Sequence, residues 1–202
     1  MKGCGVSTLA AGIYLWFSSL QAFAETVAHV VVRAKPAIVQ VRALDAQGNP
    51  VQTGTAFFIH NDGTAVTNFH IIKGAARIVA LSDAGVTYPC ERVVSNPPET
   101  DLAILKFSTV DDVPYLTLGN AAKVREGQRV FVISNPKALL DKVSEGFIVS
   151  GLGADRSAVQ ISALVSPESS GSPVLAEDGN VLGVAFYKVV NGRLLNFAIA
   201  SE

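Results

Sequence analysis

The sequence predicts an all-β fold, either a sandwich or a pair of barrels, because short apolar runs alternate with turn signals along nearly its whole length. Runs such as TGTAFFIH, DLAILKF, GQRVFVIS and VLGVAFYKV are separated by NDG, NPPET, EDGN and VNG. About a dozen strands are expected, at the spacing of roughly 8 to 12 residues that all-β domains show. Of 202 residues, 49% are apolar and 16% charged, with a net charge of −1, so neither disorder nor nucleic-acid binding is expected.

The N-terminal segment predicts a signal peptide over residues 1–24. Lys2 precedes the apolar run GVSTLAAGIYLWFSSL, and AFA at 22–24 places small residues at a cleavage site. The mature chain, residues 25–202, would then be secreted or periplasmic, without stable membrane insertion. An uncleaved signal anchor is the alternative, which the short apolar run disfavours.

Cleavage after residue 24 would remove Cys4 and leave Cys90 as the one remaining thiol. No intrachain disulfide is therefore expected, and stability must come from burial of an apolar core.

The mature chain is expected to begin with a helix and continue with strands. Val27, Val30, Val31 and Ala34 have helical spacing, and Pro36 stops that helix. Alternating apolar residues then begin the first strand, and no second long helix is expected. The segment FSTVDDVP is the best internal boundary, which gives one unit over about residues 36–112 and another over about 113–202.

Three polar residues stand at predicted strand edges: His70 in TNFHII, Asp101 in DLAILKF and Ser170 in SPESSGSPV. Taken singly, each has a structural explanation: a structural histidine, a solvated aspartate at a turn, and a serine that caps backbone amides. Together they have the order His, Asp, Ser of the chymotrypsin-type catalytic template. A serine attacks only when a histidine takes its proton, and the histidine needs a carboxylate to fix its tautomer.

The blocks GTAFFIHNDGTAVTNFHII, DLAILKF, LGNAAKVREGQRVFVISNP, EGFIVSGLG, SPESSGSPVLAEDGNVLGVAF and NFAIAS resemble, in order, those of trypsin-like serine endopeptidases. The HtrA/Deg branch is the most similar, over about residues 30–201. The resemblance implies two six-stranded β-barrels with the site in the cleft between them. It also implies that His70 is the general base, Asp101 its orienting carboxylate and Ser170 the nucleophile that forms an acyl-enzyme.

The sequence departs from this family at Glu168, where glycine is usual. The resemblance implies that the backbone amides of Glu168 and Ser170 form the oxyanion hole. A glutamate keeps the amide but restricts the backbone and adds negative charge. Ser169 stands where digestive trypsins have an aspartate that pairs with a new N-terminus, so activation by that salt bridge is not expected.

The resemblance also suggests the residues that contact the substrate, an extended or unfolded polypeptide. Leu164 and Val165 are expected at the floor of the primary pocket, which would accept a small or medium apolar side chain. Ala185, Phe186 and Tyr187 are expected at the edge against which a substrate strand pairs. HtrA proteases commonly carry a PDZ domain after the catalytic domain, and none is expected in this sequence.

Two other functions are weighed against a protease. A catalytically impaired relative that binds peptides would explain Glu168, whereas a secreted β-sandwich binding module would explain the strands but not the three ordered blocks. No cofactor and no metal site are expected, because paired cysteines or histidines at ligand spacing do not occur. The sequence leaves the oligomeric state open.

Overall fold

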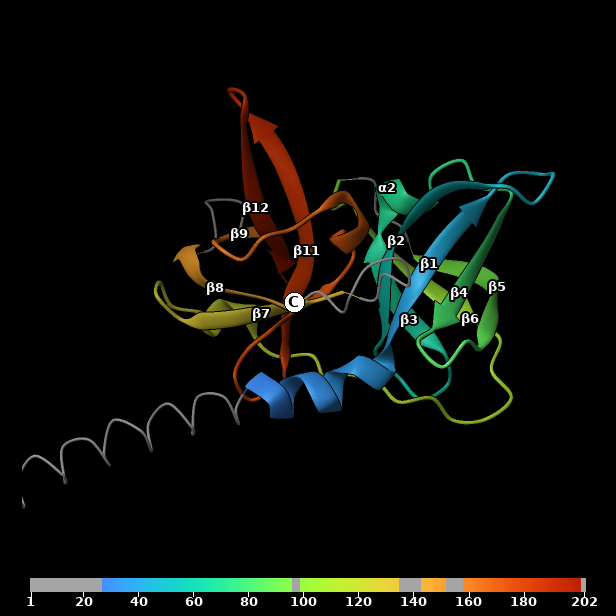
Figure 1. The fold of residues 1–202 in the computed structure, drawn as a ribbon, viewed down its shortest axis with the longest axis horizontal. Helices are drawn as coiled ribbons and strands as arrows, with labels where there is room; N and C mark the ends of the chain where they lie inside the picture. Colours follow the sequence, from blue (N-terminus) through green and yellow to red (C-terminus); the bar gives the residue numbers. More distant parts are fainter. Residues whose placement is uncertain (1–26, 96–98, 135–142, 152–157, 201–202) are drawn as a thin grey trace, which may run out of the picture.

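The computed structural model describes residues 27–95, 99–134, 143–151 and 158–200. Within these ranges, twelve strands close into two six-stranded antiparallel barrels that lie side by side (Figure 1). The predicted all-β class is confirmed, and the barrel pair is the correct alternative rather than the sandwich. The predicted signal peptide, residues 1–24, lies outside the described residues.

The first barrel closes in the order β1-β2-β3-β6-β5-β4. Its strands follow the alternation of apolar residues, as in β6, where Ala103, Leu105 and Phe107 are fully buried and the residues between them are half-buried. The strands are β1 (Ile38–Leu44), β2 (Pro50–Phe58), β3 (Thr64–Asn68), β4 (Arg77–Ser82), β5 (Thr87–Ser95) and β6 (Leu102–Phe107).

The second barrel closes in the order β10-β11-β12-β9-β8-β7. Its strands are β7 (Arg129–Ile133), β8 (Val143–Ser150), β9 (Ala158–Ile161), β10 (Pro173–Leu175), β11 (Val181–Val190) and β12 (Arg193–Ala200). The β11–β12 hairpin turns at Asn191 and Gly192, both with positive φ, as a tight two-residue hairpin turn requires.

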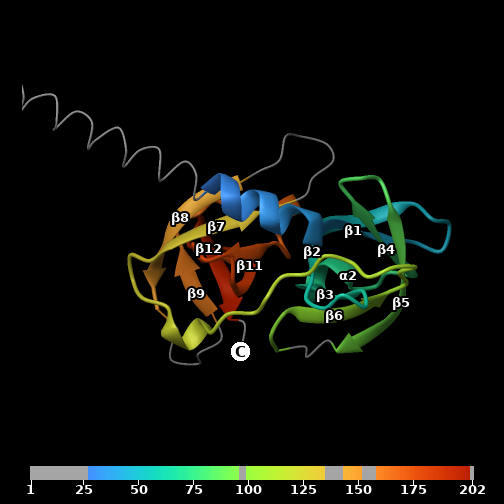
Figure 2. The same ribbon diagram turned by 90° about the horizontal axis from the view of Figure 1, so that it is seen from below.

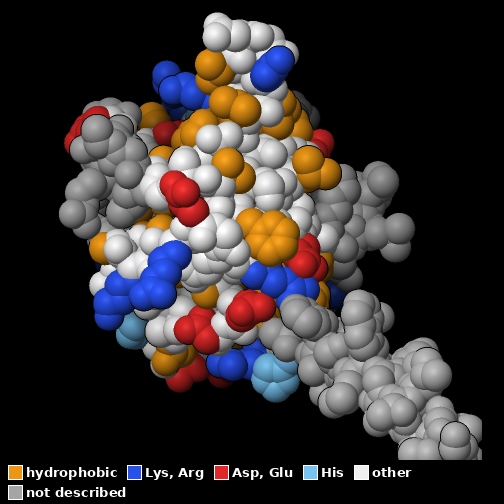
Figure 3. Space-filling view, turned by 90° about the vertical axis from the view of Figure 1, so that its left-hand side faces the viewer, with side chains coloured by type: hydrophobic (Ala, Val, Ile, Leu, Met, Phe, Trp, Pro, Cys, Tyr) orange, Lys and Arg blue, Asp and Glu red, His pale blue; other side chains and the backbone are white. Residues whose placement is uncertain are grey.

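The end of the β11–β12 hairpin extends beyond the barrel, because β9 pairs with β12 only over Asn196–Ile199 (Figure 1). Val189, Val190 and Leu194 are exposed there. Figure 3 shows hydrophobic side chains gathered below the hairpin tip, at the top of the view.

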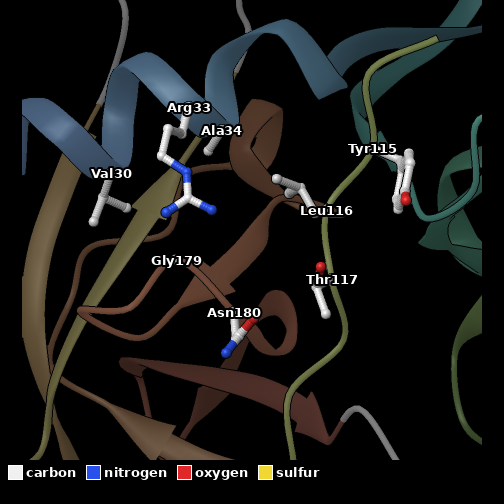
Figure 4. A pocket seen from close by; sticks show the side chains of 8 residues that line it. All are labelled: Val30, Arg33, Ala34, Tyr115, Leu116, Thr117, Gly179 and Asn180. Atoms are coloured by element: carbon white, nitrogen blue, oxygen red, sulfur yellow. The ribbon is translucent and has the colours of Figure 1, made fainter.

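A helix over residues 27–34 and the 3-10 turn η1 (Lys35–Ala37) lead into β1, which confirms the predicted N-terminal helix. The helix runs across the barrel pair (Figure 2), and its residues Val30 and Ala34 are buried. A cavity of about 170 Å³ lies between this helix, the inter-barrel segment and the turn at Gly179. Arg33 extends from the helix toward that turn (Figure 4). No helix in the described residues is long and apolar enough to cross a membrane.

The two barrels share one apolar core. Phe57 and Val66 of the first barrel pack in the same buried cluster as Phe131 and Leu175 of the second. The chain between the barrels contains the short turn η2 (Ala121–Lys123) and pairs with β11 at one bridge, Leu118 to Val181. The shared cluster holds the barrels in a fixed relation, so residues far apart in sequence can form one site.

Candidate active site

His70 and Asp101 are brought together by the pairing of β3 with β6. The last residue of β3, Asn68, lies opposite the first residue of β6, Leu102. His70 follows in the single helical turn α2 (Phe69–Ile72), which Ile71 and Ile72 anchor in the first-barrel core. The His70 side chain remains 43% exposed, so a molecule from solvent can reach its ring.

Both carboxylate oxygens of Asp101 accept hydrogen bonds from His70. The ring nitrogen Nδ1 lies 2.8 Å from Oδ2, and the backbone amide donates to Oδ1 at 2.9 Å. This arrangement favours the proton on Nδ1 and leaves Nε2 with a free lone pair. His70 is therefore oriented to accept a proton from a nucleophile through Nε2.

Asp101 has a left-handed backbone conformation, with φ at 51°. Such a conformation costs about 1–3 kcal/mol for a residue other than glycine and needs support from its surroundings. The carbonyl of Asp101 accepts bonds from the Phe69 amide at 2.9 Å and the Asn68 side-chain amide at 3.1 Å. Asn68 is fully buried and was not singled out from the sequence, although its place two residues before His70 was a usable signal.

Ser170 lies in the second barrel, directly after the 3-10 turn η3 (Pro167–Ser169). It is 1% exposed, and its hydroxyl makes no hydrogen bond. An ideal Cβ added at Gly171 would lie 3.2 Å from the side chain of Ile71, the residue after His70. The structure thus brings Ser170 to the barrel interface beside α2, while the serine–histidine hydrogen bond is not formed in this conformation.

Thr55 of β2 forms hydrogen bonds across the barrel interface with residues 166–172, here called the nucleophile segment after the role predicted for Ser170. Its amide donates to the Ser170 carbonyl at 2.9 Å, and its hydroxyl donates to the Glu168 carbonyl at 2.9 Å. The position of Ser170 relative to the first barrel therefore depends on Thr55. Nothing in the local sequence around Thr55 indicated this role.

The nucleophile segment is folded into a turn that uses its own amides. The Ser170 amide donates to the Pro167 carbonyl at 3.2 Å, and the Ser169 amide to the Ser166 carbonyl at 2.9 Å. In a trans peptide, the N–H points opposite to the C=O. The Pro167 carbonyl faces the Ser170 amide. The Glu168 N–H belongs to the same peptide bond and therefore points away from the Ser170 amide, so the two N–H groups are not directed at a common site in this conformation.

The neighbouring serines have structural contacts. The Ser169 hydroxyl lies 2.9 Å from that of Ser166 and 3.4 Å from that of Ser134, in buried surroundings. Ser172 is fully buried and its amide donates to the Ser169 carbonyl. The Ser169 hydroxyl is therefore within reach of neighbouring hydroxyls, whereas the buried hydroxyls of Ser170 and Ser172 both lack a hydrogen-bond partner.

The two residues expected at the pocket floor face opposite ways. Val165 is buried in the second-barrel cluster with Ala163, Ala185 and Ala198, whereas Leu164 is 74% exposed. The Leu164 amide donates to the Ser144 hydroxyl at 2.7 Å.

The expected substrate edge continues from the nucleophile segment. Ala185 donates to the Ser172 carbonyl at 2.8 Å and accepts from the Gly171 amide at 2.9 Å. Beyond Ala185, no strand of the described residues pairs with this side of β11. Phe186 stacks on Phe197 with ring centroids 5.4 Å apart, and Tyr187 packs against the barrel core.

Other reactive groups lie apart from this arrangement. Cys90 in β5 is a half-buried free thiol, and burial raises its pKa, which disfavours the nucleophilic thiolate. Within the ranges that the structure describes, no three His, Cys, Asp or Glu side chains are grouped as metal ligands.

Comparison with known proteins links this geometry to a family. The model of the trypsin-like peptidase domain matches residues 54–184. Similar curated proteins include the mitochondrial serine protease HTRA2 of Bos taurus, 32% identical over 190 residues, and serine protease HTRA4 of Homo sapiens, 30% identical over 191. Serine protease HTRA1 of Xenopus laevis is 27% identical over 190 residues. Each alignment covers 87% of this chain but only 39% to 41% of the relative.

Gly171 provides a test of the close approach between the nucleophile segment and β2. Its φ is +84°, and a Cβ there would overlap the Thr55 carbonyl oxygen, whereas Gly74, with φ +77°, has open space around it. Left-handed strain costs about 1 kcal/mol at either position, and overpacking adds about 1–3 kcal/mol at Gly171 alone. Urea unfolding should therefore show a larger loss for Gly171→Ala than for Gly74→Ala. Equal losses would contradict the close approach.

Proposed function

Because the chain belongs to the trypsin-like peptidase family, we propose that it is a serine endopeptidase that cleaves polypeptides with Ser170, His70 and Asp101. The observation that carries this proposal is the double hydrogen bond between Asp101 and His70, formed beside the segment that presents Ser170. The proteins compared above are named serine proteases, and this chain spans about two fifths of their length.

The proposed reaction begins with rotation of the Ser170 hydroxyl toward His70. Nε2 of His70 takes the hydroxyl proton while Oγ attacks the peptide carbonyl and forms a tetrahedral oxyanion. The histidine then gives its proton to the leaving amine, and the C–N bond breaks to leave an acyl-enzyme. Water, deprotonated by the same nitrogen, attacks the ester and releases Ser170. Asp101 stabilises the imidazolium in both steps.

We propose that an active oxyanion hole requires rotation of the Pro167–Glu168 peptide. Rotation by roughly 180° would break the hydrogen bond from the Ser170 amide to the Pro167 carbonyl. It would also replace that carbonyl with the Glu168 N–H, so that both N–H groups could bind one oxyanion. The same rotation takes the φ of Glu168 from negative to positive, since Glu168 is not among the described residues with positive φ. A positive φ is costly for glutamate and free of strain for glycine.

The proposed substrate strand pairs with the free side of β11. Ala185 directs both its backbone groups toward the nucleophile segment, so by strand alternation Tyr187 and Val189 direct theirs to the same side. An extended peptide laid there would add a strand to the sheet, which is a recurring mode of peptide recognition. An unfolded polypeptide fits this edge better than a folded surface does.

A peptide-binding protein that does not cleave is the second candidate function. Two observations favour it: the Ser170 hydroxyl makes no hydrogen bond, and the Ser170 amide is used within η3. A fluorophosphonate probe separates the two functions, because it labels only an activated serine.

Replacement of the nucleophile tests the proposed chemistry. Ser170→Ala should lower hydrolysis of an unfolded protein substrate by at least about a thousandfold, because the attacking oxygen is lost. Ser169→Ala is the matched control, because it removes a neighbouring hydroxyl and leaves Ser170 in place. Initial rates of casein hydrolysis measure both variants. Equal activity of Ser170→Ala and the unmodified chain would refute the assignment.

Replacement of Glu168 tests the peptide rotation. Glu168→Gly should raise the rate of fluorophosphonate labelling by about tenfold to a hundredfold, the range set by 1–3 kcal/mol of backbone strain and about 3 kcal/mol for one oxyanion donor. Glu168→Gln removes the charge but keeps the backbone restriction. Faster labelling of the Gly variant alone indicates backbone strain, and faster labelling of both indicates charge. No change in either shows that Glu168 does not limit acylation.

We also propose that the protein is exported, from the signal-peptide pattern over residues 1–24. Expression of residues 1–202 in a bacterium should give a periplasmic or secreted species that begins near Glu25. Intact-mass measurement of that species decides the point. A mass that still includes Cys4 would instead indicate a membrane anchor.

A further inference from the structure

Asn196 of β12 carries a buried polar atom without a partner. The residue is 8% exposed, and its side-chain oxygen Oδ1 makes no hydrogen bond. A buried amide oxygen without a partner costs free energy, and native proteins pair nearly all such atoms. An unpaired acceptor in the interior is therefore a candidate for binding a donor that arrives with a ligand.

The register places this amide at the mouth of the second barrel. Asn196 lies opposite Tyr187 on β11 and opposite Ile161 on β9, three strands that lie side by side in Figure 1. It shares a strand face with Ala198, which belongs to the buried cluster of that barrel. The Asn196 side chain therefore points into the barrel, one layer beyond Ala185 and Ala198.

The same layer adjoins the nucleophile segment. Ala185 forms hydrogen bonds with both Gly171 and Ser172. Ala198 on β12 is the cross-strand partner of Ala185, and Asn196 lies two residues from Ala198 on the same strand. Strand spacing and rise therefore place the Asn196 Cα roughly 8 Å from the Ala185 Cα. Asn196 is thus connected to the nucleophile segment through one residue, Ala185.

The interior of the second barrel around Asn196 is mostly apolar. Tyr187 and Ile161 are its cross-strand neighbours, and Ala163, Val165, Ala185 and Ala198 belong to the buried apolar cluster of the same barrel. An entering side chain would thus meet apolar walls and one hydrogen-bond acceptor. Threonine fits both, since its methyl group packs on the walls and its hydroxyl donates to Oδ1.

We propose that Asn196 determines specificity by accepting a hydrogen bond from the side chain that precedes the scissile bond, with threonine favoured over its isostere valine. This inference rests on the proposed function and replaces the purely apolar side chain expected from the sequence. Valine fills the same volume but leaves the amide oxygen unpaired, which is the penalty that discriminates between the two.

Paired octapeptides that are identical except for Thr or Val before the scissile bond test the proposal. Binding to the Ser170→Ala chain is measured by calorimetry, and hydrolysis by the unmodified chain is measured in parallel. The Thr peptide should bind about tenfold more tightly. Asn196→Leu, nearly isosteric and apolar, should abolish that preference. Gln160→Leu is the matched control, because Gln160 lies opposite Phe197 on the outward strand face and should keep the preference.

The outcomes separate this inference from the protease assignment. A Thr preference that persists in Asn196→Leu, or an absence of binding to either peptide, overturns the role of Asn196. A Thr preference that Asn196→Leu abolishes supports it, even if the unmodified chain hydrolyses neither peptide, and that last result would overturn only the protease. Asn196→Ala provides a second variant without the amide should the Leu variant fail to fold.

Discussion

The arrangement of the site depends on the hydrogen bonds by which Thr55 joins the two barrels. Its amide and hydroxyl both donate to carbonyls of the nucleophile segment, those of Ser170 and Glu168. Its own carbonyl accepts the Thr67 hydroxyl at 2.6 Å, so β2 and β3 are bonded at the same level. Because β3 leads directly into α2, one residue couples the segment that carries Ser170 to the element that carries His70.

The two halves of the site differ in how far they are organised for catalysis. In the first barrel, the carbonyl of Asp101, whose φ is positive, accepts hydrogen bonds from Asn68 and Phe69. Both carboxylate oxygens of Asp101 accept hydrogen bonds from His70. In the second barrel, the Ser170 amide donates a hydrogen bond to the Pro167 carbonyl, and the Ser170 hydroxyl makes no hydrogen bond. The proposed catalysis therefore requires the nucleophile segment to rearrange, whereas His70 already has the orientation that its proposed role as base needs.

Asn196 extends this contrast to recognition. The buried cluster of its barrel is mostly alanine and valine, and its amide oxygen has no hydrogen-bond partner. The Ser170 hydroxyl and the Asn196 amide oxygen are both buried without a hydrogen-bond partner. Both are explained if a peptide supplies the missing partners, and neither contributes to stability in its absence.

The sequence by itself determined the strands, the helix before Pro36 and the choice of His70, Asp101 and Ser170 as candidates. Strand alternation and turn residues act over a few positions, so they can be read locally, and the three candidates stand out by residue type and order. The direction of Leu164 away from the core, the use of the Ser170 amide within η3, and the roles of Thr55, Asn68 and Asn196 were not foreseen. Thr55 meets the Glu168 carbonyl across 113 residues of chain. Only the tertiary structure decided these features, because hydrogen-bond pairing and burial depend on which distant backbone groups the closed barrels bring within about 3 Å of one another.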